Sequence, residues 1–175
     1  KFFGTQKQPI TIHSSDSTGQ GIILINVKGE SLLENVLFDN LCNLSMNGWE
    51  LTGAVNFYES DVRISNCIFS NNFSEDALNI MRSKFEINNT SFSNIKSDAF
   101  DGDFSSGTIS NSIFLNCGND AIDISGGFVN IDDIFIDGSG DKCISVGENG
   151  RMIGNNISIK NSEIGITSKD LSEII

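Results

Sequence analysis

The sequence predicts an all-β fold, a parallel β-helix (solenoid) of about seven coils of about 22 residues each. Three observations predict it. Apolar residues recur in columns at intervals of 22 or 23 residues, and asparagine recurs at the same interval. The segments between them are short alternating runs bounded by Asn, Ser, Gly and Asp, without helical periodicity. In such a fold each coil stacks on the previous one at roughly 4.8 Å, and the inward side chains fill the tube.

The apolar columns define the inward positions of successive coils. The first column contains Ile64, Ile87, Ile109, Ile131 and Ile153, the second Phe69, Phe92 and Phe114, and the third Leu78, Phe100, Ile122 and Ile144. An earlier block, LLENVLFDN (32–40), matches VRISNCIFSNN (62–72) at an offset of 31 residues. This longer step predicts one coil with about nine extra residues, near LCNLSMNGWEL (41–51).

The asparagine column predicts a turn that recurs in every coil. Its members are Asn66, Asn89, Asn111 and Asn155, with Asp133 between the last two. Asparagine tolerates the left-handed backbone region, and stacked amides can hydrogen-bond along the tube. We therefore assign these residues a structural role. The single proline agrees with ladders that continue from coil to coil.

Charge and composition exclude several classes of function. Eleven Lys and Arg against 23 Asp and Glu give a net charge of −12, which argues against nucleic-acid binding and permits cation binding. No apolar run is long enough for a membrane-spanning helix. The four cysteines lack C-x-x-C spacing, so we predict small buried thiols rather than a zinc site.

The chain divides into two parts. Residues 1–19, which contain the only histidine, His13, are expected to be an N-terminal extension or the remnant of a preceding region. Residues 20–175 form the predicted β-helix domain. Because the pattern stops at Glu173-Ile174-Ile175 without a polar cap, we expect a longer protein or a neighbouring domain.

An acidic phrase occurs twice, as SDAFD (97–101) and NDAID (119–123). Strand alternation directs Asp101, Asp103 and Asp123 outward, where vertical neighbours lie about 5 Å apart. Like charges at that distance repel by about 1–3 kcal/mol, so we expect relief from a cation, from Lys142 or Arg82, or from raised pKa values.

Folding and function offer different explanations for these acids. Asp76, Asp98 and Asp120 begin their strands and can cap turns, whereas the mid-strand acids gain nothing from that role. Calcium takes six to eight oxygen ligands in flexible geometry, so it is the cofactor we expect. The expected metal ligands are Asp98, Asp101, Asp120 and Asp123.

The coil length, the isoleucine columns and the asparagine ladder resemble the right-handed parallel β-helix proteins of the pectate-lyase-like superfamily, over about residues 20–175. Asp98 with NDAID is similar to the calcium site of the calcium-dependent pectate lyases of polysaccharide lyase family 9. Asp98, Asp120 and Asp123 match that motif, while Asn119 replaces an Asp and Ala121 a Gly. The family's lysine base would fall near Ser145, and Lys142 precedes that position by three residues.

This resemblance implies calcium-assisted β-elimination from a uronate-containing polysaccharide, in a secreted or cell-envelope protein. Calcium would neutralise the uronate carboxylate, and a basic side chain would remove the acidified proton. The candidate bases are Lys142, then Lys169 and Arg82, although neighbouring carboxylates raise the pKa of a lysine. The further binding candidates are Asp76, Asp103, Asp141, Glu148 and Trp49.

Two other functions remain open. A non-catalytic module that binds carbohydrate or calcium, or that serves as a structural spacer, needs the same fold and no base. A glycoside hydrolase needs a pair of carboxylates, such as Asp101 with Asp123 or Asp103 with Asp123. The polygalacturonase-like family also carries Gly-His-Gly and Arg-Ile-Lys, and neither motif occurs in this sequence.

Overall fold

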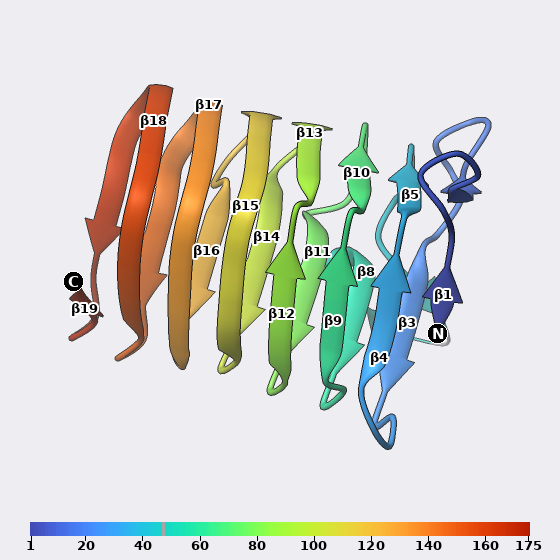
Figure 1. The fold of residues 1–175 in the computed structure, drawn as a ribbon, viewed down its shortest axis with the longest axis horizontal. Coiled ribbons are helices and arrows are strands. Elements are labelled where there is room, and N and C mark those ends of the chain that lie inside the picture. The colour runs from blue at the N-terminus through green and yellow to red at the C-terminus, as the bar shows by residue number, and fades with distance from the viewer. Residues whose placement is uncertain (47) are drawn as a thin grey trace.

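The computed structural model describes residues 1–46 and 48–175, except for the side chain of Met46. It is an all-β parallel solenoid of about 7 turns, as the sequence predicts (Figure 1). The coils stack along one axis from the N-terminal to the C-terminal end. The described part of the chain contains no helix long and apolar enough to cross a membrane.

Three ladders of parallel strands run along the tube, and we call them the first, second and third sheets. The first sheet contains β1 (Phe2–Phe3), β4 (Ser31–Glu34), β9 (Val62–Ser65), β12 (Lys84–Asn88), the opening parts of β15 (Ser106–Cys117), β17 (Phe128–Gly147) and β18 (Arg151–Ser168), and β19 (Glu173–Ile174). The second contains β2 (Ile10–His13), β5 (Val36–Asp39), β10 (Ile68–Ser70), β13 (Ser91–Ile95) and the following parts of β15, β17 and β18.

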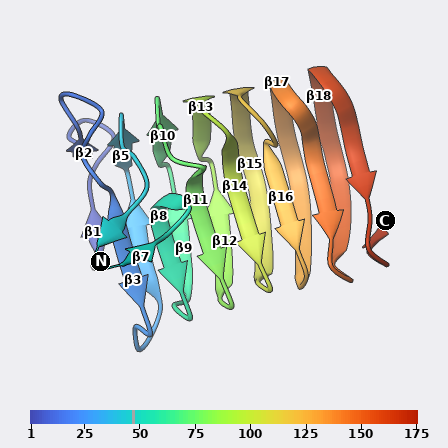
Figure 2. The same ribbon diagram turned by 180° about the vertical axis from the view of Figure 1, so that it is seen from behind.

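The third sheet carries the predicted acidic positions. It contains β3 (Ile22–Ile25), β8 (Gly53–Tyr58), β11 (Asp76–Met81), β14 (Asp98–Asp103), β16 (Ile122–Ser125) and the last parts of β17 and β18. Figure 2 shows these strands side by side along the tube.

The predicted long coil precedes β8. It contains an antiparallel pair, β6 (Ser45–Met46) and β7 (Trp49–Glu50), which lies outside the parallel ladders. Asn47, within the predicted segment 41–51, lies outside the described residues. The offset of 31 residues is confirmed, because Leu33 pairs with Ile64 and Phe38 with Phe69.

Buried columns fill the tube. Phe38, Phe69, Phe92 and Phe114 stack with successive ring centroids 4.9, 4.8 and 4.7 Å apart, close to the spacing of the coils themselves. The column of Leu78, Phe100, Ile122 and Ile144 is likewise fully buried and in register. All four cysteines are free thiols, three of them buried as predicted and Cys42 half-buried.

The last coil departs from the predicted columns by one residue. Ile131 pairs with Gly154 and Asp132 with Asn155, so Ile153 and Asn155 do not continue the predicted columns. The turn before β18 holds three residues, 148–150, where the preceding coil has only Gly126 and Gly127 between its strands. This extra residue makes the step 23 rather than 22, and Asn156 takes the left-handed turn position (φ 49°).

Asparagines in the left-handed conformation form two ladders, of which the sequence analysis identified one. The first contains Asn35, Asn66, Asn89, Asn111 and Asn156, and the second Asn40, Asn71, Asn94, Asn116 and Asn161. In the second, Asn94 Nδ2 donates to Asn71 Oδ1 and Asn116 Nδ2 to Asn94 Oδ1, each at 3.2 Å. The structural role of the first ladder is confirmed, since Asn89 donates to Asn66 in the same way.

Candidate functional site

Acidic side chains from three coils gather on the outer side of the third sheet. The strand register places Asp76 beside Asp98, Asp101 beside Asp123 and Asp123 beside Ser145. Asp101 and Asp123 directly follow Phe100 and Ile122, which are anchored in the core, so strand alternation fixes the outward direction of these two acids. We call this set the acidic patch: Asp76, Asp98, Asp101, Asp103, Asp120 and Asp123.

Two members of the acidic patch cap the turns between coils. Asp98 Oδ1 accepts hydrogen bonds from the Asp120 N–H and from Asn119 Nδ2, both at 2.7 Å. Asp120 Oδ1 accepts one from the Lys142 N–H at 2.9 Å. Each of these acids therefore commits one oxygen to the backbone of the next coil, which is the turn-capping role that the sequence suggested for this column.

Asp101 and Asp103 share a single buried amide. Asn79 Nδ2 donates to Asp101 Oδ2 at 2.9 Å and to Asp103 Oδ2 at 3.3 Å, and Asn79 is only 5% exposed. Burial raises the pKa of Asp101 to about 9, and the charges of Asp76, Asp103 and Asp123 add to the effect. Burial raises the pKa of Asp103 as well. One amide is too weak a donor to offset the repulsion between these acids.

Three buried oxygens at the acidic patch have no hydrogen-bond partner among the described residues: Asp76 Oδ2, Asp123 Oδ1 and Ser145 Oγ. Asp76 is only 2% exposed, and burial raises its pKa to about 7. Burial also raises the pKa of Asp98 to about 6. A buried acceptor without a donor costs about 1–3 kcal/mol, and more for a charged group. The acidic patch therefore contains acceptors that the protein itself does not satisfy.

Lys142 lies at the edge of the acidic patch, but its ammonium group is occupied. Its Nζ contacts the Asp141 carboxylate and lies 3.6 Å from Asp120 Oδ1. The hydrogen bond to Asp141, followed by the charge of Asp120, raises the pKa of Lys142. In this arrangement Lys142 holds its proton and acts as a counter-ion.

The other two candidate bases lie differently. Arg82 turns toward the preceding coil, where Nη1 donates to Tyr58 Oη at 3.1 Å and lies 4.0 Å from Glu59 Oε1. The Lys169 side chain lies against Gly147, where a methyl group on the glycine would come within 2.9 Å of Lys169 Cε. Gly147 belongs to the same outward column as Asp103, two coils away.

The remaining predicted binding residues are dispersed. Asp141 pairs with Lys142, whereas Glu148 lies in the exposed turn after β17. Trp49 is 61% exposed on β7, in the coil before Asp76. Within residues 1–46 and 48–175, neither Glu148 nor Trp49 makes a side-chain hydrogen bond or ion pair with the acidic patch. Sequence reasoning omitted Asn79 and Ser145 from the site, although both occupy the outward column of Asp101 and Asp123.

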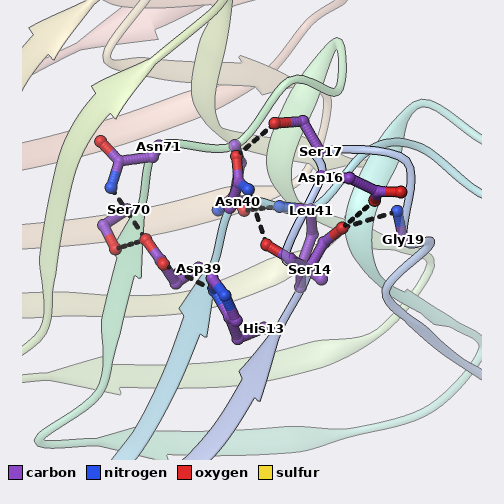
Figure 3. A network of polar contacts seen from close by, with 11 residues as sticks. His13, Ser14, Asp16, Ser17, Gly19, Asp39, Asn40, Leu41, Ser70 and Asn71 are labelled. Atoms are coloured by element: carbon purple, nitrogen blue, oxygen red, sulfur yellow. Dashed lines mark hydrogen bonds and ion pairs between the residues drawn. The ribbon is translucent and has the colours of Figure 1, made fainter.

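A second polar cluster, at the N-terminal end of the second sheet, has a structural role (Figure 3). Asp39 accepts hydrogen bonds from Ser70 Oγ at 2.7 Å and Asn71 Nδ2 at 2.8 Å, and it contacts His13 Nδ1 at 2.9 Å. These contacts, that of Ser70 foremost, lower the pKa of Asp39. Neighbouring Asn40 donates to the Ser14 carbonyl at 2.6 Å and so fixes the loop that follows β2.

In this arrangement the carboxylates of the acidic patch are not grouped around a common ion position. Across the described ranges, no three His, Cys, Asp or Glu side chains are already drawn together as a metal site. A cation at the acidic patch would therefore require rotation of the outward side chains, chiefly those with unsatisfied oxygens. No protein-family model matches the chain, and a search of curated proteins also finds no match.

Proposed function

We propose that this protein binds uronate-containing polysaccharides through calcium held by the acidic patch. The supporting observation is the set of unsatisfied buried oxygens on Asp76, Asp123 and Ser145, beside two acids that share one amide. A divalent cation would satisfy these oxygens and offset the burial and the mutual repulsion that raise the carboxyl pKa values. We further propose a right-handed, pectate-lyase-like solenoid in a secreted or envelope protein, where such polymers occur.

The acids divide into two groups as calcium ligands. Asp101 and Asp123 are paired on adjacent coils, and among the described residues neither carboxylate accepts from a backbone N–H; Asp76 and Asp103 flank them. Asp98 and Asp120 each offer one further oxygen, because their Oδ1 atoms already bind backbone N–H groups. We therefore centre the site on Asp101 and Asp123 rather than distributing it equally over the four acids predicted from the sequence.

The net charge explains why an acidic glycan would need calcium in order to bind at the acidic patch. A chain of charge −12 repels a polyuronate, so direct contact with the acidic patch is unfavourable. Calcium coordinated on one side by Asp101 and Asp123 retains open positions for a uronate carboxylate. The glycan would then bind only when calcium is present.

Calorimetry with calcium and with polygalacturonate tests this proposal. We expect the wild type to bind calcium, and polygalacturonate only in its presence, and the double variant Asp101→Asn/Asp123→Asn to bind calcium about tenfold more weakly or worse. Asp132→Asn is the matched control, because Asp132 is an exposed outward acid on the first sheet. Equal calcium affinity in the double variant and the control would contradict the proposal.

The position of Lys142 beside Asp120 favours a second candidate function, β-elimination. Calcium that draws both Asp141 and Asp120 away from Lys142 would lower the lysine pKa toward that of a usable base. Lys142→Ala is then expected to abolish the absorbance of unsaturated products while glycan binding persists. If the wild type forms no unsaturated product, this function is excluded and the binding function stands alone. Reducing ends formed without unsaturation would instead indicate the hydrolase.

A further inference from the structure

A groove of about 610 Å³ runs across four coils at the corner between the first and second sheets, away from the acidic patch of the third. Figure 1 shows this corner where β9 leads into β10 and β12 into β13. Three of these coils each contribute an asparagine of the first ladder and the outward residue two positions later, and the coil before them contributes Glu34 and Asn35. The three best-defined pairs are Asn66 with Ile68, Asn89 with Ser91, and Asn111 with Ile113.

The groove combines exposed amides with exposed aliphatic side chains. Ile68 is 45% exposed and Ile113 is 43% exposed, although both occupy outward strand positions. The ladder bond from Asn89 to Asn66 uses one N–H and one acceptor site, so each amide keeps further hydrogen-bonding capacity toward solvent. Such a surface is complementary to a ligand that presents hydroxyl groups beside C–H faces.

Charge restricts the ligand class further. Among the described residues that line the groove, Glu34 is the only carboxylic acid and none is Lys, Arg or His, while burial raises the pKa of the Cys67 thiol to about 11. The groove therefore offers no counter-ion to a phosphate or carboxylate group. The ligand is therefore an uncharged polar molecule, unlike the one proposed for the acidic patch.

The repeat distance distinguishes a glycan from a peptide. Coils recur at about 4.8 Å, whereas side chains on one face of an extended peptide recur at about 6.6–6.8 Å. A peptide along the tube would thus lose register within about two coils. The sugar units of an extended pyranose chain advance by a distance close to the coil spacing. We propose that this groove binds an extended, uncharged polysaccharide that lies parallel to the tube axis.

The N-terminal segment sets one end of this site. Residues 4–6 line the groove, and Asn35 Nδ2 donates to the Gly4 carbonyl at 3.3 Å. A backbone pair between Thr5 and Gln8 holds this segment in a tight turn. The bound chain would therefore start against this turn and extend toward Asn111.

Calorimetry with cellohexaose and xylohexaose, in chelator, tests the proposal without calcium. We expect the wild type to bind at least one of them, and Asn89→Gly and Ile113→Ser each to weaken binding about three- to tenfold. Glycine keeps the left-handed turn, so Asn94→Gly of the second ladder is the matched control for Asn89→Gly. Ile25→Ser, at a position 42% exposed outside the groove, is the control for Ile113→Ser.

The outcomes separate this proposal from the calcium function. Binding that is lost in the groove variants but kept in both controls and in Asp101→Asn would support it. Failure of both hexasaccharides to bind, or equal weakening in variants and controls, would overturn it. Neither result depends on calcium. The calcium proposal for the acidic patch can therefore be contradicted while the groove proposal is supported.

Discussion

Replacing Asp101 with asparagine is expected to stabilise the calcium-free protein at pH 8. At this pH Asp101 must take up a proton on folding, whereas asparagine is already neutral and keeps an oxygen that can accept from Asn79. Removing this cost is worth at least about 1–3 kcal/mol. For a chain of this size the melting temperature should rise by about 2–4 °C for each kcal/mol.

The same substitution should flatten the pH dependence of stability. In the folded protein the pKa of Asp101 is about 9, that of Asp76 about 7 and that of Asp98 about 6, all above the ordinary value of 3.8. Folding therefore favours the protonated acids, and their stabilisation is complete below about pH 4 and is lost as pH rises through these values. Asp39, whose pKa is lowered, has the opposite effect on stability. Its contribution is complete above pH 3.8 and is lost as the pH falls below that value.

Thermal melts between pH 5 and pH 9, with chelator and with calcium, measure this effect. In chelator the wild type should lose stability as the pH rises, and the Asp101→Asn variant should lose less. Calcium should restore the wild type at pH 8 and leave the variant nearly unchanged. Asp132→Asn again serves as the control. A wild type that is equally stable at both ends of the pH range would contradict the raised pKa values of these carboxyl groups.

Replacing Phe92 with alanine is expected to cost about 3–5 kcal/mol of stability. Its ring lies fully buried between Phe69 and Phe114, with centroids 4.8 and 4.7 Å away, so the cavity opens in the middle of the stack. Coils contact only their neighbours, so this loss weakens two interfaces at once.

Chemical denaturation of the Phe92→Ala variant checks this expectation. Phe73→Ala is the control, because Phe73 is 48% exposed and its truncation leaves no internal cavity. A similar loss of stability in the two variants would mean that the phenylalanine stack does not form the core of the tube.

Much of the fold follows from the sequence because each apolar column repeats at a fixed interval. The predicted columns of Phe69, Phe92 and Phe114 and of Leu78, Phe100, Ile122 and Ile144 are correct to the residue. The slip at Ile153 and Asn155 was not predictable from that interval, because Glu148 and Asn149 both take left-handed conformations in a turn that is one residue longer. A repeat length does not specify where an additional turn residue is inserted.

The candidate site was less predictable because side-chain direction depends on local hydrogen bonds. Strand alternation placed Asp101 and Asp123 outward, and their register brings them together. The capping of backbone N–H groups by Asp98 and Asp120 was also expected, but nothing in the pattern could indicate that Lys142 is held by Asp141. The second ladder carried a visible signal, since Asn71, Asn94 and Asn116 are 23 and 22 residues apart.

The two asparagine ladders bear on how such a protein changes length. From Asn35 to Asn161 every coil turns at the same two corners through a left-handed residue, which is asparagine except at Asp133 and Gly138, so the path entering a coil matches the path leaving it. Duplication of a 22-residue unit would thus add one rung of about 4.8 Å without disturbing the geometry on either side. Tube length, and with it the span of polymer covered, can evolve in whole units while the corners stay constant.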